Sequence, residues 1–227
     1  MNYQNHLKTA ILASVEAGRE ILTIYQSNFT VDYKADNSPL TMADRAAHKI
    51  IVNCLENFGI PVLSEEGKHT PYNERKNWNR LWIVDPLDGT KEFIKKNGEF
   101  TVNIALIENN TPVLGVVFAP DREQLYFALQ DLGAYKIDDF QVIQKIYNGM
   151  GDGSLTTDEL INESMKLPGD KPAGAPYTIV GSRSHATPEL EQFVEEKRRE
   201  FKQVDFIPAG SSLKICLVAE GKADIYP

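Results

Sequence analysis

The stretch from residue 81 to residue 94 reads LWIVDPLDGTKEFI and brings two aspartates directly after an apolar run. Residues 81–84 are apolar strand formers, so they predict a short buried strand. Pro86 is expected to end this strand at once, because proline punctuates loops. Asp85 and Asp88 are therefore predicted to lie at the carboxyl end of a core strand.

A short helix is predicted to follow the two aspartates, over residues 90–94. Thr90 can cap its N-terminus, and Glu92 suits its first turn. The free backbone N–H groups of a helix start can bind an anion, and Gly89 would let that anion approach closely. The sequence thus places a potential anion site beside the two carboxylates.

The two aspartates admit two interpretations. Either they only shape a turn, since aspartate bonds readily to nearby backbone, or they bind a divalent metal ion at a strand end, where open sheets collect ligands. A third carboxylate favours the metal: Glu65 directly follows another short predicted strand, residues 61–64. Carboxylate oxygens suit Mg²⁺ better than zinc.

Composition limits the classes of function. The chain has 227 residues, 42% hydrophobic and 25% charged, with a net charge of -8. This charge, without a basic stripe, disfavours a nucleic-acid polymer as partner. No apolar run approaches the length of a membrane span, and no secretory signal is visible. Cys54 and Cys216 lack metal-ligand spacing, so reduced thiols in a cytoplasmic protein are expected.

The pattern of apolar residues predicts an α+β fold with a largely antiparallel sheet, followed by a strand-helix-strand-helix-strand run. Helices are predicted at 7–26, 41–58, 188–201 and 211–220, and strands at 29–34, 61–64, 81–84, 100–108, 112–119, 125–128, 133–137, 177–181, 204–207 and 223–226. We expect an N-terminal α+β metal-binding subdomain at 1–137, an insertion or linker at 138–174, and a partial C-terminal α/β subdomain at 175–227.

Residues 148–159 read NGMGDGSLTTDE and nearly fit a calcium-binding loop. Asn148 and Met150 stand at its first and third positions, which removes charge and one oxygen ligand. A glycine-rich loop before a short helix is therefore the preferred interpretation, and calcium binding stays open.

Five ordered blocks of the chain resemble the inositol monophosphatase superfamily of Mg²⁺-dependent, lithium-sensitive phosphatases. They read KADNSPLTMAD, VLSEEGK, DPLDGTKEFIKKNGEFTVNIALIE, GSRSH and GSSLKICLVAEGKADIYP, and they cover most of the chain except residues 138–174. Within the superfamily they look like the bacterial CysQ branch of 3′(2′),5′-bisphosphate nucleotidases. The resemblance implies a layered αβαβα sandwich and hydrolysis of the 3′-phosphate of adenosine 3′,5′-bisphosphate to AMP and phosphate, in sulfate assimilation and nucleotide recycling.

The resemblance also implies residue roles, carried over by matching positions. The implied Mg²⁺ ligands are Glu65, Asp85, Asp88 and the backbone carbonyl of Leu87. Asp44, in the first turn of the second predicted helix, would work with Thr90 to orient and activate the attacking water. Asp44 would accept a proton through the Thr90 hydroxyl.

Further matched positions imply contacts with the nucleotide substrate. Backbone N–H groups of Gly89 and Thr90 would hold its phosphate. Ser211 and Lys214, and more weakly His185, match positions that contact the nucleotide. Each has a structural alternative, since Ser211 can be a helix cap, Lys214 a solvated residue, and His185 a hydrogen-bonding loop residue.

Other functions stay open at this stage. Inositol monophosphatase or fructose-1,6-bisphosphatase activity would use the same fold, because fold does not fix substrate. A non-catalytic module that binds a nucleotide or an anion is a further alternative. The family pattern continues past the equivalent of Pro227 into an arginine-bearing loop and a Trp-Asp motif with a further metal ligand, so the C-terminal part is expected to be incomplete. A monomer is expected.

Overall fold

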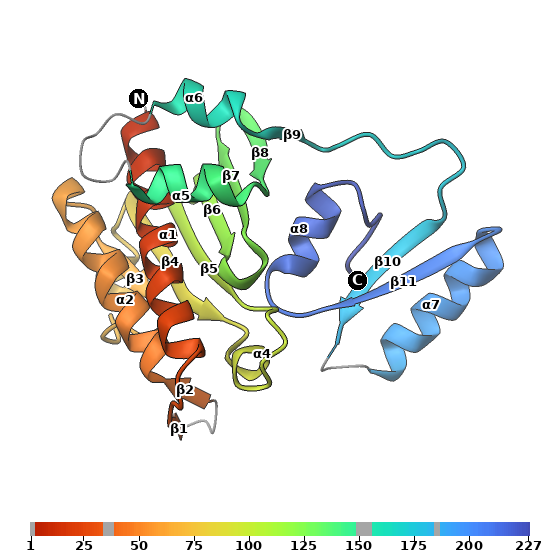
Figure 1. The fold of residues 1–227 in the computed structure, drawn as a ribbon, viewed down its shortest axis with the longest axis horizontal. Coiled ribbons are helices and arrows are strands. Elements are labelled where there is room, and N and C mark those ends of the chain that lie inside the picture. The colour runs from red at the N-terminus through yellow and green to blue at the C-terminus, as the bar shows by residue number, and fades with distance from the viewer. Residues whose placement is uncertain (1–2, 34–38, 149–155, 184–186) are drawn as a thin grey trace.

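The computed structural model describes residues 3–33, 39–148, 156–183 and 187–227. Its elements form five layers, which follow one another from left to right in Figure 1: helices α1 and α2, a large sheet, helix α8, a small sheet and helix α7. This order confirms the α+β class and the αβαβα sandwich expected from the sequence. No helix within the described ranges is long and apolar enough to cross a membrane.

The first layer consists of α1 (Gln4–Tyr25) and α2 (Met42–Leu55), which confirms the two predicted N-terminal helices. Their apolar residues recur at helical spacing, so each helix buries one face against the large sheet. Gly18 allows α1 to lie close to that sheet, because an added Cβ would meet the Phe118 ring at 2.4 Å.

Within the described ranges, the large sheet has seven strands in the order β3-β4-β5-β6-β7-β8-β9. Their bounds are Val62–Ser64, Arg80–Asp88, Thr101–Glu108, Thr111–Ala119, Gln124–Leu129, Gly133–Ile137 and Met165–Leu167. β3 and β4 are parallel, and each later pair of neighbours is antiparallel. The predicted largely antiparallel sheet is therefore confirmed.

A two-residue turn joins β5 to β6. Asn109 and Asn110 have φ angles of 49° and 63°, and positive φ at both positions is what a type I′ turn requires. Asparagine tolerates this left-handed conformation better than most residues. The hairpin predicted at this point is confirmed.

Strand β4 does not end at Pro86, so that prediction is wrong. Its pairing with β5 continues from Asp85 opposite Asn103 to Asp88 opposite Thr101, with an irregularity between the two aspartates. Proline is accepted in a sheet where the ladder is interrupted in this way. Asp85 is thus the last residue in the regular register, and Asp88 lies beyond the irregularity.

The small sheet pairs β10 (Tyr177–Ser182) with β11 (Val204–Ala209) in parallel. Helix α7 (Pro188–Glu200) lies on one side of it and α8 (Leu213–Ala219) on the other, as Figure 1 shows. These four elements confirm the strand-helix-strand-helix part of the predicted run.

The last predicted strand, residues 223–226, is wrong. Within the described residues this stretch makes a single bridge, between Ile225 and Ile179. The carboxylate of Asp224 accepts the backbone N–H of Thr178 at 2.6 Å. A side chain thus takes the place of a backbone partner, and no regular ladder forms there.

Helices cover both faces of the large sheet. Alternate residues of a strand point to opposite faces, and in β6 both sets of residues are apolar. Val116 and Phe118 of β6 belong to the core beneath α1. Val117 and Ala119 instead pack with Leu213 of α8.

Buried polar side chains also join α8 to the large sheet. The Glu220 carboxylate accepts hydrogen bonds from the Tyr126 hydroxyl at 2.6 Å and from Lys136 Nζ at 3.1 Å, and all three residues are buried. Burial alone would raise the pKa of Glu220, but donors including Lys222 outweigh it and lower the pKa.

Short elements complete the chain. They are β1 Val31–Tyr33, β2 Pro39–Thr41, the 3₁₀ turns Glu56–Phe58 and Pro120–Arg122, and the helices α3 Tyr72–Arg75, α4 Thr90–Ile94, α5 Phe140–Asn148 and α6 Thr157–Asn162. Residues 138–174 carry α5, α6 and β9, and β9 extends the large sheet by pairing with β8. The division into subdomains at 1–137, 138–174 and 175–227 stays a prediction.

The near-match to a calcium loop falls largely outside the described residues, which exclude 149–155. Glu159 is described, and its carboxylate accepts the Thr156 backbone N–H at 2.7 Å and the Thr156 hydroxyl at 2.8 Å. This capping box at the start of α6 accounts for Glu159 without a cation. Calcium binding therefore stays an open prediction.

The close contact at Gly18 yields a test of the packing between the first two layers. Gly18→Ala should lower the free energy of unfolding by about 1–2 kcal/mol, because overpacking outweighs the better helix propensity of alanine. Gly115→Ala on β6 is the control, since nothing lies within 4 Å of its added Cβ. Urea unfolding should show a change below about 0.5 kcal/mol for the control, and equal effects in both variants would contradict the packing argument.

Candidate active site

The parallel pairing of β3 with β4 brings two acidic residues together. Ser64 pairs with Val84, so Glu65, which follows β3, and Asp85, the next residue of β4, are neighbours in space. The Glu65 backbone N–H donates to the Val84 carbonyl at 3.0 Å, which continues the ladder by one bond. Asp88 follows at the end of β4.

Asp85 carries the electrostatic consequence of this arrangement. Burial raises the pKa of Asp85 above its ordinary value, and the negative charges of Asp88 and Glu65 raise it further. A hydrogen bond from the Leu87 backbone N–H, at 3.2 Å, acts in the opposite direction and is outweighed. The two neighbouring carboxylates thus oppose the ionisation of Asp85.

This donor set fits a hard divalent cation. Among the residues that the structure describes, no three Asp, Glu, His or Cys side chains form a closed metal-binding group. Like charges with no ion between them repel, whereas a cation among them would be stabilised by each carboxylate. Binding of Mg²⁺ by Glu65, Asp85, Asp88 and the Leu87 carbonyl stays a prediction.

A second pair of predicted site residues is brought into contact. Thr90 Oγ1 lies 3.3 Å from Asp44 Oδ1 and 3.4 Å from the Leu87 carbonyl oxygen, so its one proton has two alternative acceptors. The other carboxylate oxygen, Asp44 Oδ2, accepts the backbone N–H and the hydroxyl of Thr41, each at 2.7 Å. Oδ1 is therefore the oxygen available to Thr90.

Asp44 is buried in the first turn of α2. Burial raises its pKa, and the hydrogen bonds from Thr41 offset part of that effect. A carboxylate with a raised pKa is a better proton acceptor than an ordinary aspartate.

Thr90 does not cap α4, so that prediction is wrong. Gly89 occupies the N-cap position with φ of 90°, and it makes no side-chain cap. The Thr90 hydroxyl is already engaged across the site with Asp44. An added Cβ on Gly89 would lie 2.9 Å from the Glu99 carbonyl oxygen and 3.2 Å from Ser211 Cβ, so glycine is required there by conformation and by space.

Ser212 is a site residue that the sequence analysis missed. It holds the N-cap position of α8, yet its hydroxyl makes no cap and donates to Asp88 Oδ2 at 2.7 Å. The two residues lie 124 positions apart. A local sequence pattern carries no signal for a contact between residues so far apart in the chain.

Three of the predicted substrate-side residues, Gly89, Ser211 and Lys214, line one cavity of ≈ 300 Å³. Its lining includes Asp88, Gly89, Ser211, Ser212, Lys214 and Tyr226. Lys214 Nζ donates to the Ser211 carbonyl oxygen at 2.7 Å, and this hydrogen bond places the positive charge of Lys214 at the cavity wall. Ser211 Oγ also accepts the Leu213 N–H at 3.4 Å. The alternative role of Ser211, as a helix cap, therefore stays open. His185 lies outside the described residues.

Comparison with known proteins identifies relatives of this chain. Residues 2–227 match the model of the Inositol monophosphatase family. The 3′(2′),5′-bisphosphate nucleotidase CysQ of Shigella flexneri is 41% identical over 215 residues, which cover 93% of this chain and 75% of that protein. CysQ of Escherichia coli strain K12 is 40% identical over 216 residues with the same coverage.

Solved structures support the same relationship. A crystal structure of CysQ from Bacteroides thetaiotaomicron, described as a bacterial member of the inositol monophosphatase family, is similar with a TM-score of 0.86 and 49% identity, covering 99% of this chain and 80% of that one. An inositol monophosphatase of Thermotoga maritima has a TM-score of 0.70 at 22% identity, which shows the fold alone.

The repulsion at Asp85 predicts how stability depends on pH and on metal. The pKa of Asp85 is raised in the folded state, so this group stabilises the fold below its unfolded pKa of about 4, and the contribution is lost as pH rises through the raised pKa. Between about pH 5 and pH 8 in a chelator, Tm should fall more for the wild type than for Asp85→Asn. Mg²⁺ should then restore Tm in the wild type only.

Asp205→Asn is the matched control, since Asp205 is an exposed aspartate on β11. It should behave as the wild type in thermal melts at both pH values. An equal gain in Tm on Mg²⁺ addition for wild type and Asp85→Asn would contradict a metal site at this position.

Proposed function

Because the chain belongs to the inositol monophosphatase family, we propose that it hydrolyses the 3′-phosphate of adenosine 3′,5′-bisphosphate to AMP and phosphate. The observation that carries the proposal is the contact between Asp44 and Thr90 beside three acidic side chains. Relatives named as bisphosphate nucleotidases support the choice of substrate. Such a phosphoric monoester hydrolase would serve sulfate assimilation and nucleotide recycling.

Metal dependence accords with this family of phosphatases, and we propose Mg²⁺ as the metal. The residues that would hold it are Glu65, Asp85, Asp88 and the Leu87 carbonyl. Bound there, Mg²⁺ would neutralise charge on the phosphoryl oxygens and lower the pKa of water. Asp85 is desolvated by burial and repelled by Asp88 and Glu65, so a cation bound there would be stabilised.

The chain's own residues handle the proton. A water beside the Thr90 hydroxyl can pass a proton to Thr90 Oγ1 while Thr90 gives its own proton to Asp44 Oδ1. Thr41 holds the other carboxylate oxygen through two hydrogen bonds, which fixes the orientation of Oδ1. Attack on phosphorus then breaks the bond to the 3′-oxygen, and that oxygen takes up a proton as AMP leaves.

The cavity beside the acidic cluster suits an anionic substrate. Lys214 contributes a positive charge to its wall, and a lysine is a suitable phosphate partner. Gly89 and Thr90 would offer backbone N–H groups to the phosphate, and Ser211 a hydroxyl to the nucleotide. His185 remains a proposed contact on the strength of its sequence position. A monomer and a cytoplasmic location also remain proposals.

A direct test is release of phosphate from adenosine 3′,5′-bisphosphate by the protein as encoded by its gene. Turnover should require Mg²⁺ and should be abolished by Li⁺, while AMP should not be hydrolysed. Inositol 1-phosphate and fructose 1,6-bisphosphate are the comparison substrates. If the protein hydrolysed either of these two esters faster than adenosine 3′,5′-bisphosphate, its function would instead be that of an inositol monophosphatase or a fructose-1,6-bisphosphatase. Mg²⁺-independent nucleotide binding that survives Asp85→Asn, without turnover of any ester, would instead identify a binding module.

The role of the Thr90 hydroxyl has its own test. Thr90→Val keeps the shape of the side chain and removes the hydroxyl, so kcat should fall roughly 100-fold or more. Thr90→Ser keeps the hydroxyl and should retain kcat within about tenfold of the wild type. Steady-state kinetics with Mg²⁺ in excess measures both. If valine and serine variants were equally active, the hydroxyl would have no part in proton transfer.

A further inference from the structure

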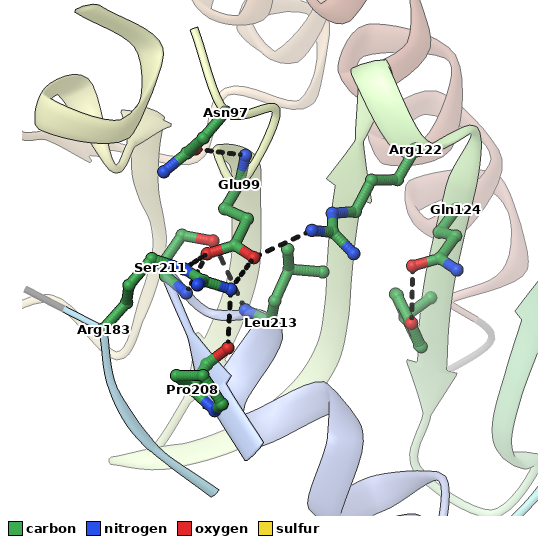
Figure 2. Close-up of polar contacts among 10 residues, drawn as sticks. Asn97, Glu99, Arg122, Gln124, Arg183, Pro208, Ser211 and Leu213 are labelled. Atoms are coloured by element: carbon green, nitrogen blue, oxygen red, sulfur yellow. Dashed lines mark hydrogen bonds and ion pairs between the residues drawn. The ribbon is translucent and has the colours of Figure 1, made fainter. Parts of the chain in front are cut away.

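Glu99 connects the two sheets beside the candidate site. It lies between α4 and β5 and is only 4% exposed. Its Oε1 accepts hydrogen bonds at 2.8 Å from Arg122 Nη2 and from Arg183 Nη2. Its Oε2 accepts from Arg183 Nε at 2.9 Å and from the Gly210 backbone N–H at 2.8 Å. Figure 2 shows the two arginines approaching the carboxylate from opposite sides.

Arg183 extends this connection to both strands of the small sheet. It follows β10, and its backbone N–H donates to the Ala209 carbonyl at 3.1 Å. Its Nη2 also donates to the Pro208 carbonyl of β11 at 2.8 Å. One guanidinium therefore binds Glu99 of the large-sheet side and the end of β11 at once (Figure 2).

The segment held in this way is Gly210–Ser212, which we call the serine loop. An added Cβ on Gly210 would lie 2.7 Å from Glu92 Cγ and 3.0 Å from Glu99 Cβ, so the loop is pressed against these side chains. Ser211 has φ of 47°, a conformation unfavourable for a residue other than glycine. Such a conformation persists only where the surroundings impose it.

The serine loop carries the groups that face the cavity. Ser212 donates to Asp88, and the Ser211 carbonyl accepts from Lys214. The placement of both contacts depends on where the loop sits. The Asp44 and Thr90 contact, in contrast, lies on α2 and α4 and does not involve the loop.

We infer that Glu99 is a positioning residue, which fixes the serine loop in its substrate-binding conformation through Arg183 and the Gly210 N–H. The kinetic part of this inference rests on the proposed nucleotidase function. The loop-fixing part rests on geometry alone. Glu99 makes no contact with the catalytic pair in the described structure, so its loss should affect substrate binding more than the chemical step.

The first measurement is hydrogen exchange of the backbone amides in residues 209–212, without substrate. Glu99→Gln should raise their exchange roughly tenfold, because hydrogen bonds to a charged acceptor are lost, while exchange in α1 stays unchanged. Glu220→Gln is the matched control. Glu220 is also a buried carboxylate with a cation partner, but it joins α8 to the large sheet and lies at the end of α8 opposite the serine loop. It should leave exchange at 209–212 within about twofold of the wild type.

The second measurement is steady-state kinetics on adenosine 3′,5′-bisphosphate. Glu99→Gln should raise KM roughly tenfold and change kcat by less than about threefold, and Glu220→Gln should change neither by more than about twofold. A uniform rise in exchange along the chain, or an equal response of Glu99→Gln and Glu220→Gln, would show that Glu99 only stabilises the fold in general. Either result would overturn the inference. Faster loop exchange with unchanged KM would overturn it too. A wild type without turnover would count against the proposed function alone, because exchange is measured without substrate and still decides whether Glu99 holds the loop.

Discussion

The constraint on which the site depends is the placement of Glu65, Asp85 and Asp88 at the ends of two parallel strands. The pairing of β3 with β4 fixes the first two side by side, and the irregular end of β4 delivers the third. Burial and like charge make this arrangement unfavourable without a counterion. The layers around it supply the stability that the site lacks, since α1 and α2 bury an extensive apolar core against the same sheet. Functional sites commonly break the local rules of stability in this manner.

The remaining parts of the site are arranged around these carboxylates by close backbone approach. Gly89 lies against Glu99 and Ser211 with no room for a side chain, which brings the start of α4 and the serine loop together. Thr90 then reaches Asp44 on α2, and Ser212 reaches Asp88 on β4. Two long-range hydrogen bonds and one close backbone approach thus hold four separate segments of chain together at the site. This coupling explains why the small sheet, far from the acidic cluster in sequence, bears on the site.

Local features of the sequence predicted local structure well. The hairpin at Asn109–Asn110 follows from residues that tolerate positive φ, and the two N-terminal helices follow from apolar periodicity. The predictions failed where tertiary pairing overrode a local signal, as at Pro86, which lies inside β4 because the ladder is irregular there. The contacts of Ser212 with Asp88 and of Glu99 with Gly210 span 124 and 111 residues. Their energy comes from the folded arrangement, so no short pattern in the sequence could have indicated them.

The carboxylates of Glu99 and Glu220 lie in electrostatic surroundings opposite to those of Asp85. Glu99 and Glu220 face arginine, lysine or N–H donors, and these partners lower their pKa despite burial. Asp85 faces two further carboxylates, and its pKa is raised. The chain thus stabilises the charges of Glu99 and Glu220 with its own donors, whereas at the acidic cluster the neighbouring carboxylates repel Asp85. A group whose charge is opposed by its own surroundings is suited to an external cation, and this contrast supports our proposal that the metal and the chemistry lie at this acidic cluster.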